Sequence, residues 1–600
     1  MLPTLLHRLL AVLAIGLLVI SSQLCDGFVL QSNYTTDAIS VGQVRSLCSN
    51  GRPKVPLVEA TISGLHQAML DGAADCSDIL SAYTQRIMQF DKQTGLNSLR
   101  ELNPKIAAIG LQKDEQLSQI RETNGSLPPM FCVPLLVKDN FDTVDMAACN
   151  GASSLLDNVA QQDATQVRLL KAAGAVVLAK ANMAEWAFDP DISIGSAFGV
   201  VRNPYDLDHV TAGSSGGTAA GISANLGLMG LGSDTGNSIR GPAGHCGIVG
   251  IRSSLGLTST AGILPLDITS DVGGPMGRTV EDTVRAFQLL VGYDPSDNLT
   301  ELALTNPPPQ NYTDYLQPGL DGVRVGIMLQ TVDFSTADPA MMELFQGALS
   351  DIANAGAIVV GNVTITGNSL GSLPWDGRNG EWYTGFGLAG HWEDLQCDRF
   401  MYDMDKYLSN AGTHWRNVLD IVQDGGYHPS VNTTMYERTT VDYSPLHYPP
   451  PYLEALGYIC GCGQFYNNTC RAEFRQRLID SMDAANVDVL VYPTWSNPAE
   501  LVGQWEVDDG NNSPQIAPPT GAPAMVVPMG FTPEGLPGSL QILARPFDEA
   551  TMIRVAYGYE QATQHRTAPV LFPECQGQET APWMALSPSV DAAALTLSGR

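Results

Sequence analysis

The sequence predicts an α/β fold around one large sheet, because stretches with helical spacing of apolar residues alternate with short apolar runs. Residues 58–125 carry apolar side chains three and four positions apart, which is typical of amphipathic helices; Asp75 or Ser77 suits the start of the second helix. Residues 131–140 then contain an apolar run that ends at Lys138, which indicates a short buried strand.

The alternation of helix and strand continues along the rest of the chain, without an internal repeat or a low-complexity linker. The further elements that we expect are helices at 164–174, 280–292 and 549–563, and strands at 175–182, 323–329, 488–493, 524–531 and 539–547. We therefore expect residues 28–600 to form a single domain.

The charge of the chain excludes one large class of partners. The 600 residues include 32 Lys and Arg against 62 Asp and Glu, which gives a formal net charge of −30. Such a field repels polyphosphate, so we expect no nucleic-acid partner. Because 44% of the residues are apolar, the chain also has ample material for a large core and is not disordered.

The first 27 residues have the pattern of a secretory signal peptide. His7 and Arg8 precede an apolar run at 9–20, and small and polar residues follow it. The run is too short to span a bilayer comfortably, although an uncleaved membrane anchor is the alternative. No later stretch reaches about 18 uninterrupted apolar residues, so we expect no stable membrane insertion after cleavage.

Glycosylation signals agree with export. Asn-x-Ser/Thr acceptors occur at Asn33, Asn124, Asn298, Asn311, Asn362, Asn432, Asn467 and Asn511, the last of which is weakened by a following proline. Their number favours a eukaryotic secretory route over a bacterial one. The sequence therefore predicts a secreted, extracellular glycoprotein.

The 11 cysteines suit an oxidising compartment. If Cys25 is removed with the signal peptide, the remaining ten can form as many as five disulfides, with a pairing that the sequence does not determine. Cys460 and Cys462 lack the Cys-x-x-Cys spacing of zinc ribbons, so we expect disulfides there and no metal. Cys246 lies in an apolar, Gly-rich run and is expected to be a buried free thiol.

Residues 365–470 differ from the rest in composition and are expected to form a variable, Cys-containing insertion. They hold four of the eight Trp and ten of the 19 Tyr. Two interpretations stay open: a surface subdomain held by disulfides, or an aromatic wall over a ligand pocket.

The densest functional signal is a pair of flexible turns within residues 211–256. Residues 213–217 read Gly-Ser-Ser-Gly-Gly, and residues 235–238 read Thr-Gly-Asn-Ser, with an Ala/Gly-rich helix and a short strand between them. Successive N–H groups in such turns can converge on an oxyanion. Lys138, at the end of an apolar strand, can be neutral and act as a base if it is buried, or it can reach the surface and pair with Asp139.

A second hydrolase pattern is also present but lacks its usual context. Gly213-x-Ser215-x-Gly217 matches a nucleophile elbow, which requires a strand directly before the turn. Here the preceding residues are polar and turn-prone, and the candidate bases His245 and His565 lie in no supporting motif. We therefore regard this match as accidental.

Taken together, these blocks resemble the amidase signature family, whose members are hydrolases with a Ser–cis-Ser–Lys triad. The resemblance lies in the segments GSSGG, SDTGNSIRGPAGHCGIVGIR, VPLLVKDNFDT, LLKAAGAVVLAKANMAEWAF, GGPMGRTVED and GLPGSLQILARPFDEATMIRVAYGYEQAT. They extend over about 58–300 and 485–568, in the family's order. The resemblance implies a large mixed, mostly parallel twisted sheet covered by helices on both faces, and no metal or organic cofactor.

The resemblance also assigns roles to residues. Lys138 corresponds to the catalytic lysine, Ser214 to the bridging serine on a cis peptide, and Ser238 to the nucleophile, while Asp234 and Arg240 hold the loop. The N–H groups of Thr235, Gly236, Asn237 and Ser238 correspond to the oxyanion hole. The family usually has glycine where this chain has Asn237, which puts the geometry of the hole in question.

The implied activity is hydrolysis of an amide C–N bond through an acyl-enzyme on Ser238, with Ser214 as proton relay and Lys138 as base. A soluble extracellular amidase acting on small-molecule or peptide amides fits the signal peptide best. The alternatives are a membrane-anchored fatty-acid-amide-type hydrolase and a secreted binding protein that kept the fold with little turnover. The charge and the export signals argue against a role in tRNA amidotransfer.

Overall fold

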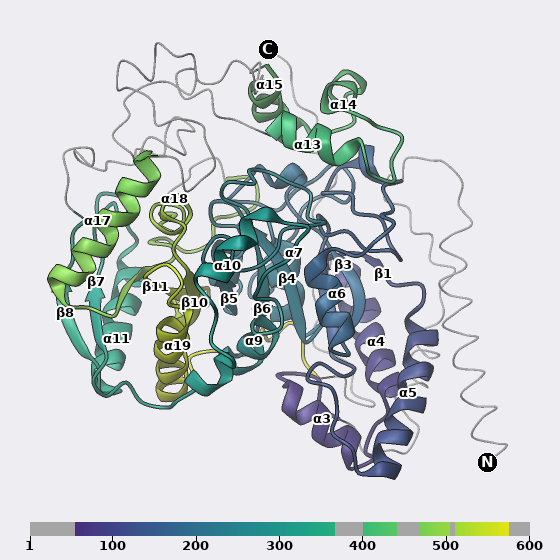
Figure 1. The fold of residues 1–600 in the computed structure, drawn as a ribbon, viewed down its shortest axis with the longest axis horizontal. Coiled ribbons are helices and arrows are strands. Elements are labelled where there is room, and N and C mark those ends of the chain that lie inside the picture. Colours follow the sequence, from purple (N-terminus) through teal and green to yellow (C-terminus); the bar gives the residue numbers. More distant parts are fainter. Residues whose placement is uncertain (1–54, 366–399, 441–468, 505–509, 575–600) are drawn as a thin grey trace.

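A computed structural model of the chain describes residues 55–365, 400–440, 469–504 and 510–574. Its centre is one sheet of 11 strands in the order β1-β3-β2-β4-β6-β5-β10-β11-β9-β7-β8 (Figure 1). The strands are Leu99–Leu102 (β1), Pro134–Lys138 (β2), Val176–Ala181 (β3), Met229–Asp234 (β4), Val249–Arg252 (β5), Val272–Gly277 (β6), Arg324–Ile327 (β7), Ile358–Asn362 (β8), Val489–Pro493 (β9), Ala524–Phe531 (β10) and Pro537–Ala544 (β11).

The sheet is mixed, as expected, but parallel pairs are the minority. Strand β2 runs parallel to β3 and β4, and β7 runs parallel to β8 and β9. The other six pairings are antiparallel, so the expectation of a mostly parallel sheet is wrong. The reason is local: β10 and β11 form a hairpin, and short connections cannot join neighbouring strands in parallel.

Helices surround this sheet. The α-helices are Ile62–Leu70 (α3), Cys76–Thr94 (α4), Ile106–Thr123 (α5), Thr165–Ala172 (α6), Gly216–Ser223 (α7), Arg240–His245 (α8), Val280–Phe287 (α9), Leu302–Thr305 (α10), Pro339–Asn354 (α11), Phe400–Leu408 (α13), Val418–Asp424 (α14), Asn432–Thr440 (α15), Thr469–Ala485 (α17), Ala517–Thr520 (α18) and Glu549–Thr563 (α19). The predicted cap Asp75 does precede α4, where its N–H donates to Asp78 at 3.1 Å.

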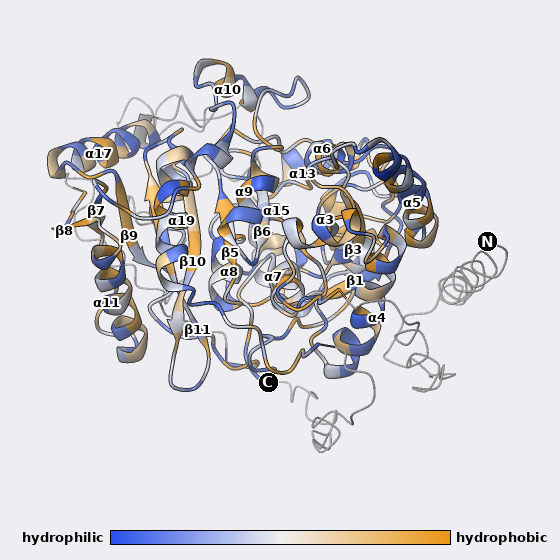
Figure 2. Cartoon of the chain, turned by 90° about the horizontal axis from the view of Figure 1, so that it is seen from below, coloured by the Kyte–Doolittle hydropathy of each residue, from blue (hydrophilic) through white to orange (hydrophobic). Residues whose placement is uncertain are grey.

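Both faces of the sheet are covered, because its strands are apolar on both sides. In β10, Met525 and Val527 pack with residues of α9, α11 and α19, whereas Val526 between them packs in the cluster that contains Ala243 of α8. Figure 2 shows β9, β10 and β5 in hydrophobic colours, while α5, α11 and α19 carry hydrophilic stretches. This burial on two faces explains why these strands read as continuous apolar runs.

Within the predicted insertion, the described residues 400–440 form α13, α14 and α15, which lie together above the sheet in Figure 1. Phe400 packs edge-on against Trp186 of the main body, with ring centroids 6.2 Å apart. Trp415 donates its indole N–H to the carbonyl of Ser154 at 2.7 Å. The three helices thus share an apolar core with the main body. The other Trp residues of the insertion lie outside the described residues.

The structure tests several of the expectations about cysteines. Cys76 and Cys132 form a disulfide that joins the start of α4 to the segment before β2. Cys246 is a buried free thiol, as predicted, and Cys149 is a second one, so the ten cysteines beyond Cys25 cannot form five disulfides. The cluster around Cys460 and Cys462 lies outside the described residues.

Among the helices that the structure describes, none is long and apolar enough to cross a membrane.

Candidate active site

Lys138 ends the buried strand β2, and its side chain is completely buried. Its Nζ lies 2.6 Å from Ser214 Oγ, 2.8 Å from Ser233 Oγ and 3.2 Å from the carbonyl oxygen of Ser233. The alternative in which Lys138 reaches the surface beside Asp139 is therefore wrong. Asp139 is instead paired with Arg100, whose Nε lies 2.9 Å from the carboxylate.

Burial also determines the charge of Lys138. Desolvation lowers its pKa from 10.5 to about 7, although the negative charges of Asp234 and Asp271 oppose the shift. A substantial fraction of the lysine is therefore neutral at pH 7. A neutral amine has two N–H groups and one lone pair. With the N–H groups directed at the Ser233 oxygens, the lone pair can accept the proton of the Ser214 hydroxyl.

Ser214 lies in the first Gly-Ser turn, directly before α7. The peptide bond between Gly213 and Ser214 is cis, as the family resemblance implies. A side chain at position 213 would collide with the loop before it, because its Cβ would lie 2.1 Å from the carbonyl oxygen of Asp189. Glycine is therefore required for this close approach.

The second turn follows strand β4 and is held in place by the buried carboxylate of Asp234. Asp234 accepts hydrogen bonds from the backbone N–H of Ile239 at 3.1 Å and from Arg240 Nε at 3.0 Å. Arg252 Nη1 lies 2.9 Å from the other oxygen of Asp234. Although burial opposes ionisation, the two guanidinium groups hold the pKa of Asp234 far below its usual range. Arg240 also donates to the carbonyl of Gly236, which fixes the turn from its other end.

The turn of residues 235–238 leaves its amides free. Among the residues that the structure describes, no group accepts a hydrogen bond from the N–H groups of Thr235, Gly236, Asn237 or Ser238. Four unpaired N–H groups in one turn next to a buried lysine form an arrangement that can bind an oxyanion.

Ser238 is placed beside Ser214 through the backbone. Its carbonyl accepts a hydrogen bond from the N–H of Ser215 at 3.2 Å. Its side chain is 5% exposed, and its hydroxyl makes no hydrogen bond to any described residue. The structure thus joins Lys138 and Ser214 by a direct hydrogen bond, whereas it links Ser238 to this pair through the adjoining main chain.

Asn237 does not adopt the left-handed backbone conformation, which asparagine tolerates better than most residues. It is absent from the described residues with positive φ. Its side chain is buried, and Nδ2 donates to the carbonyl of Pro190 at 3.2 Å. The exchange of glycine for asparagine is therefore compatible with an ordinary backbone in this turn.

Some residues that contribute to the site were not predicted from the sequence. Ser233 contacts Lys138 twice and also accepts from Asn140 Nδ2 at 2.9 Å. Asp271 accepts the Thr235 hydroxyl at 2.5 Å, and burial raises the pKa of Asp271 to about 6. Ser233 has one usable signal, since it precedes Asp234 at the end of an apolar run. Asp271 has no such sequence signal, because only the antiparallel pairing of β4 with β6 brings it close to Thr235.

The alternative nucleophile elbow is not formed. Ser215 is buried, and its hydroxyl donates to the carbonyl of Ser233 at 3.1 Å. His245 is stacked on Trp495 with ring centroids 4.3 Å apart, and His565 is paired with Asp351. Neither imidazole forms a hydrogen bond with a serine of the two turns, so neither of these two histidines is placed as a base for them.

A groove of about 580 Å³ opens beside the site. Ser233 and Asp271 line it, and so do Asp403, Lys406 and Tyr407 of α13, whereas none of the predicted site residues does. Tyr407 donates to Asp142 at 2.7 Å, so the insertion is tied to the main body within this groove. Helix α13 thus lines a groove that extends to Ser233, which contacts Lys138.

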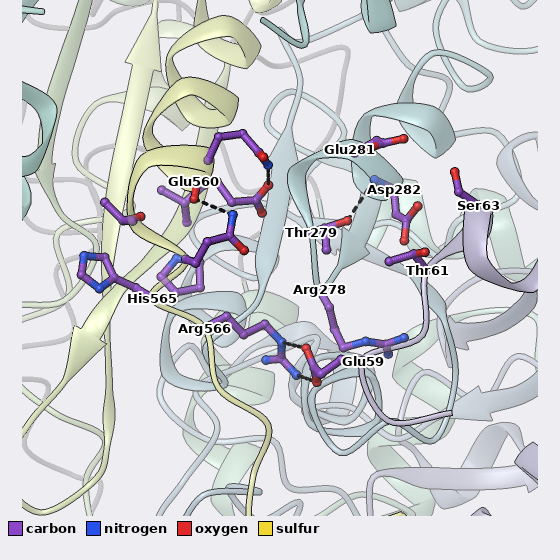
Figure 3. A pocket seen from close by; sticks show the side chains of 15 residues that line it. Glu59, Thr61, Ser63, Arg278, Thr279, Glu281, Asp282, Glu560, His565 and Arg566 are labelled. Carbon is purple, nitrogen blue, oxygen red and sulfur yellow. Dashed lines mark hydrogen bonds and ion pairs between the residues drawn. The ribbon is translucent and has the colours of Figure 1, made fainter. Parts of the chain in front are cut away.

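A smaller hollow of about 200 Å³ lies elsewhere, between the start of α9 and the end of α19 (Figure 3). Arg566 forms a two-point ion pair with Glu59 there, with both N–O distances at 2.8 Å. None of the predicted site residues contributes to this hollow. Within the described ranges, no group of three or more His, Cys, Asp or Glu residues could hold a metal ion.

Comparison with known proteins agrees with this geometry. The model of the Amidase family matches residues 78–367 and 464–553. A glutamyl-tRNA(Gln) amidotransferase component from Desulforapulum autotrophicum is 30% identical over 521 residues, which cover 84% of this chain and 97% of that protein.

Solved structures show the same relationship. Peptide amidase from Stenotrophomonas maltophilia has a TM-score of 0.71 at 27% identity, over 86% of this chain and 100% of that one. An amidase family protein from Bacillus anthracis has a TM-score of 0.70 at 25% identity, over 89% of this chain and 95% of that one. The family match covers more than half of the chain and includes both turns and the lysine-bearing strand. The chain therefore belongs to the amidase signature family.

Proposed function

We propose that this amidase-family hydrolase cleaves polar amides, such as peptide C-terminal amides, through an acyl-enzyme on Ser238. The observation that carries the proposal is the 2.6 Å hydrogen bond between a buried, partly neutral lysine and Ser214, next to a turn with four free amides. A neutral amine in this position can act as a base without a histidine.

In the proposed reaction, Ser238 Oγ attacks the amide carbonyl carbon. Its proton passes to Ser214 Oγ while the proton of Ser214 passes to Lys138 Nζ. The free N–H groups of residues 235–238 stabilise the oxyanion; loss of one such donor typically costs about 10²–10³ in rate. Lys138 then returns the proton through Ser214 to the leaving nitrogen, the C–N bond breaks, and an ester of Ser238 remains. Water repeats the sequence and releases the carboxylic acid.

The groove beside Ser233 supports a polar substrate. Charged side chains of Asp163, Arg168 and Lys406 line it, together with several hydroxyl and amide groups and with apolar residues such as Ile268. Burying a long aliphatic chain against charged groups would leave them without solvent, which is costly. This lining favours peptide or small polar amides over the fatty-acid-amide alternative. The solved relative from Stenotrophomonas maltophilia is itself a peptide amidase.

Secretion is part of the proposal, and two observations support it. The disulfide between Cys76 and Cys132 is typical of oxidising compartments. The sequons at Asn124, Asn298, Asn311, Asn362 and Asn432 all lie on exposed residues, where a glycan can be attached. Asn511 is completely buried, so we exclude it as an acceptor in the folded protein. A tRNA amidotransferase role, which the names of several relatives suggest, fits the net charge of −30 poorly.

A substrate panel tests the proposed function. The purified chain is expected to release acid and amine from peptide C-terminal amides and small polar amides faster than from long-chain fatty acid amides. A serine-directed phosphonate should attach to Ser238, as shown by peptide mass spectrometry. A clear preference for fatty acid amides would favour the membrane-anchored alternative. A folded protein that is neither labelled nor active would be an inert binding protein.

The pH dependence of activity should follow Lys138. Its pKa lies near 7, and only the neutral form can accept a proton. Below this pKa, kcat/KM is expected to fall about tenfold per pH unit, and above it to reach a plateau. Initial rates measured between about pH 5 and pH 9 check this. A flat profile, or activity that rises towards low pH, would be inconsistent with a neutral lysine base.

A further inference from the structure

We propose that Asn237 is a positioning residue that sets the distance between the nucleophile turn and the relay turn, through a carbonyl that both turns share. The nucleophile turn is residues 235–238, and the relay turn is residues 213–215. This inference rests on the proposed roles of Ser238 and Ser214. It assigns a function to the position where the chain differs from the glycine that is usual in the family.

The shared acceptor is the carbonyl oxygen of Pro190. It accepts the backbone N–H of Gly213 at 2.7 Å and Asn237 Nδ2 at 3.2 Å. A carbonyl oxygen has two lone pairs, so both hydrogen bonds can form together. One atom of the loop therefore binds the residue before Ser214 and the residue before Ser238. This arrangement couples the positions of the two serines.

The loop that carries Pro190 is fixed against the relay turn independently of Asn237. The carbonyl of Asp189 touches Gly213 so closely that no side chain could be placed there. Ser193 Oγ accepts the N–H of Gly216 at 3.0 Å and donates to the carbonyl of Ala212 at 3.1 Å. Because the loop is tied on both sides of Ser214, a donor that reaches Pro190 from the other turn is held relative to Ser214.

Without the Asn237 side chain, the two turns lose their shared link through the carbonyl of Pro190. The hydrogen bond from the Ser215 N–H to the Ser238 carbonyl would remain. Asp234 and Arg240 hold the ends of the nucleophile turn, and the hydrogen bond of Asn237 adds a contact within it that opposes rotation of the turn relative to the loop of Pro190. The proton transfer between the two hydroxyls depends steeply on their separation, so the rate of the chemical step should respond more than substrate binding does.

Two variants of Asn237 and one control test this proposal. Asn237→Gly removes the donor and loosens the backbone, and Asn237→Asp keeps the shape but replaces the donor with an acceptor. Asn103→Asp is the matched control: Asn103 is also buried and donates to a backbone carbonyl, that of Val177 at 2.9 Å, away from both turns. For each protein, kcat, KM, the rate of phosphonate labelling at Ser238 and the melting temperature are measured.

For Asn237→Gly we expect kcat and the labelling rate to fall together by about tenfold, with KM nearly unchanged. For Asn237→Asp we expect kcat and the labelling rate to fall about 100-fold, because the charge of the aspartate also opposes an oxyanion at the adjacent amides. Asn103→Asp should lower the melting temperature at least as much while keeping kcat. Unchanged kcat in both Asn237 variants, a rise in KM alone, or a loss that the control shares would overturn the proposal. If the wild-type protein is not labelled at Ser238, the proposed function fails, and this inference fails with it.

Discussion

Replacing Ser238 with alanine is expected to abolish amidase turnover and phosphonate labelling while leaving the protein folded. The change removes the attacking oxygen, and loss of a nucleophile from a catalytic group of this kind costs on the order of 10⁴–10⁶ in kcat. The Ser238 hydroxyl has no hydrogen-bond partner among the described residues, so alanine leaves no buried group unpaired. Initial rates on a peptide amide, together with a melting curve, provide the measurement.

The neighbouring serine supplies the control for that experiment. Ser215 would be the nucleophile of the alternative elbow, and its hydroxyl instead donates to the carbonyl of Ser233. Ser215→Ala should therefore still be labelled at Ser238. If Ser215→Ala lost labelling while Ser238→Ala kept it, the assignment of the nucleophile would be reversed.

Replacing Lys138 with methionine is expected to lower kcat/KM by about 10³ or more and to remove the pH dependence near 7 from any residual activity. Methionine fills similar space but has no lone pair on nitrogen to accept the Ser214 proton. The fold should tolerate the change, because a completely buried amine is replaced by an apolar group. The pH profile separates loss of the base from a general disturbance.

Lys180 offers a matched control for this substitution. It is equally buried, and it lies on the neighbouring strand β3 opposite Val137, so that its side chain emerges on the other face from Lys138. Burial lowers its pKa to about 8, and its Nζ donates to the carbonyl of Phe141. Lys180→Met should affect stability but keep the ionisation near 7. If Lys138→Met retained that ionisation, another group would have to be the base.

The fold class and most apolar strands could be predicted because their signals are local. The closing helix occupies the predicted residues 549–563, and the strand that ends at Lys138 ends there in the structure. Strand β6 could not be predicted in this way, since Val272–Gly277 contains Pro275 and three glycines. It is a strand because it pairs with β4 on one side and β5 on the other. Strand direction likewise depends on connections that periodicity does not report.

The candidate site likewise contains residues that a local sequence pattern predicts and residues that it does not. The two turns and the lysine were predicted from segments that each carry a recognisable local pattern. Ser233, Asp271 and Pro190 contribute through contacts between distant segments, and a serine, an aspartate or a proline in isolation predicts nothing. The partners that set charge and spacing around a catalytic group are therefore the part that requires the three-dimensional arrangement.

The acceptor that joins the two turns belongs to the main chain, and this limits how the enzyme can change. No codon change at position 190 can delete a carbonyl, so variation there can only move it. Natural selection, or an engineer, can remove or restore the link at a single site, position 237. The spacing of the two hydroxyls is thus open to adjustment by one substitution, without rebuilding the scaffold that carries them.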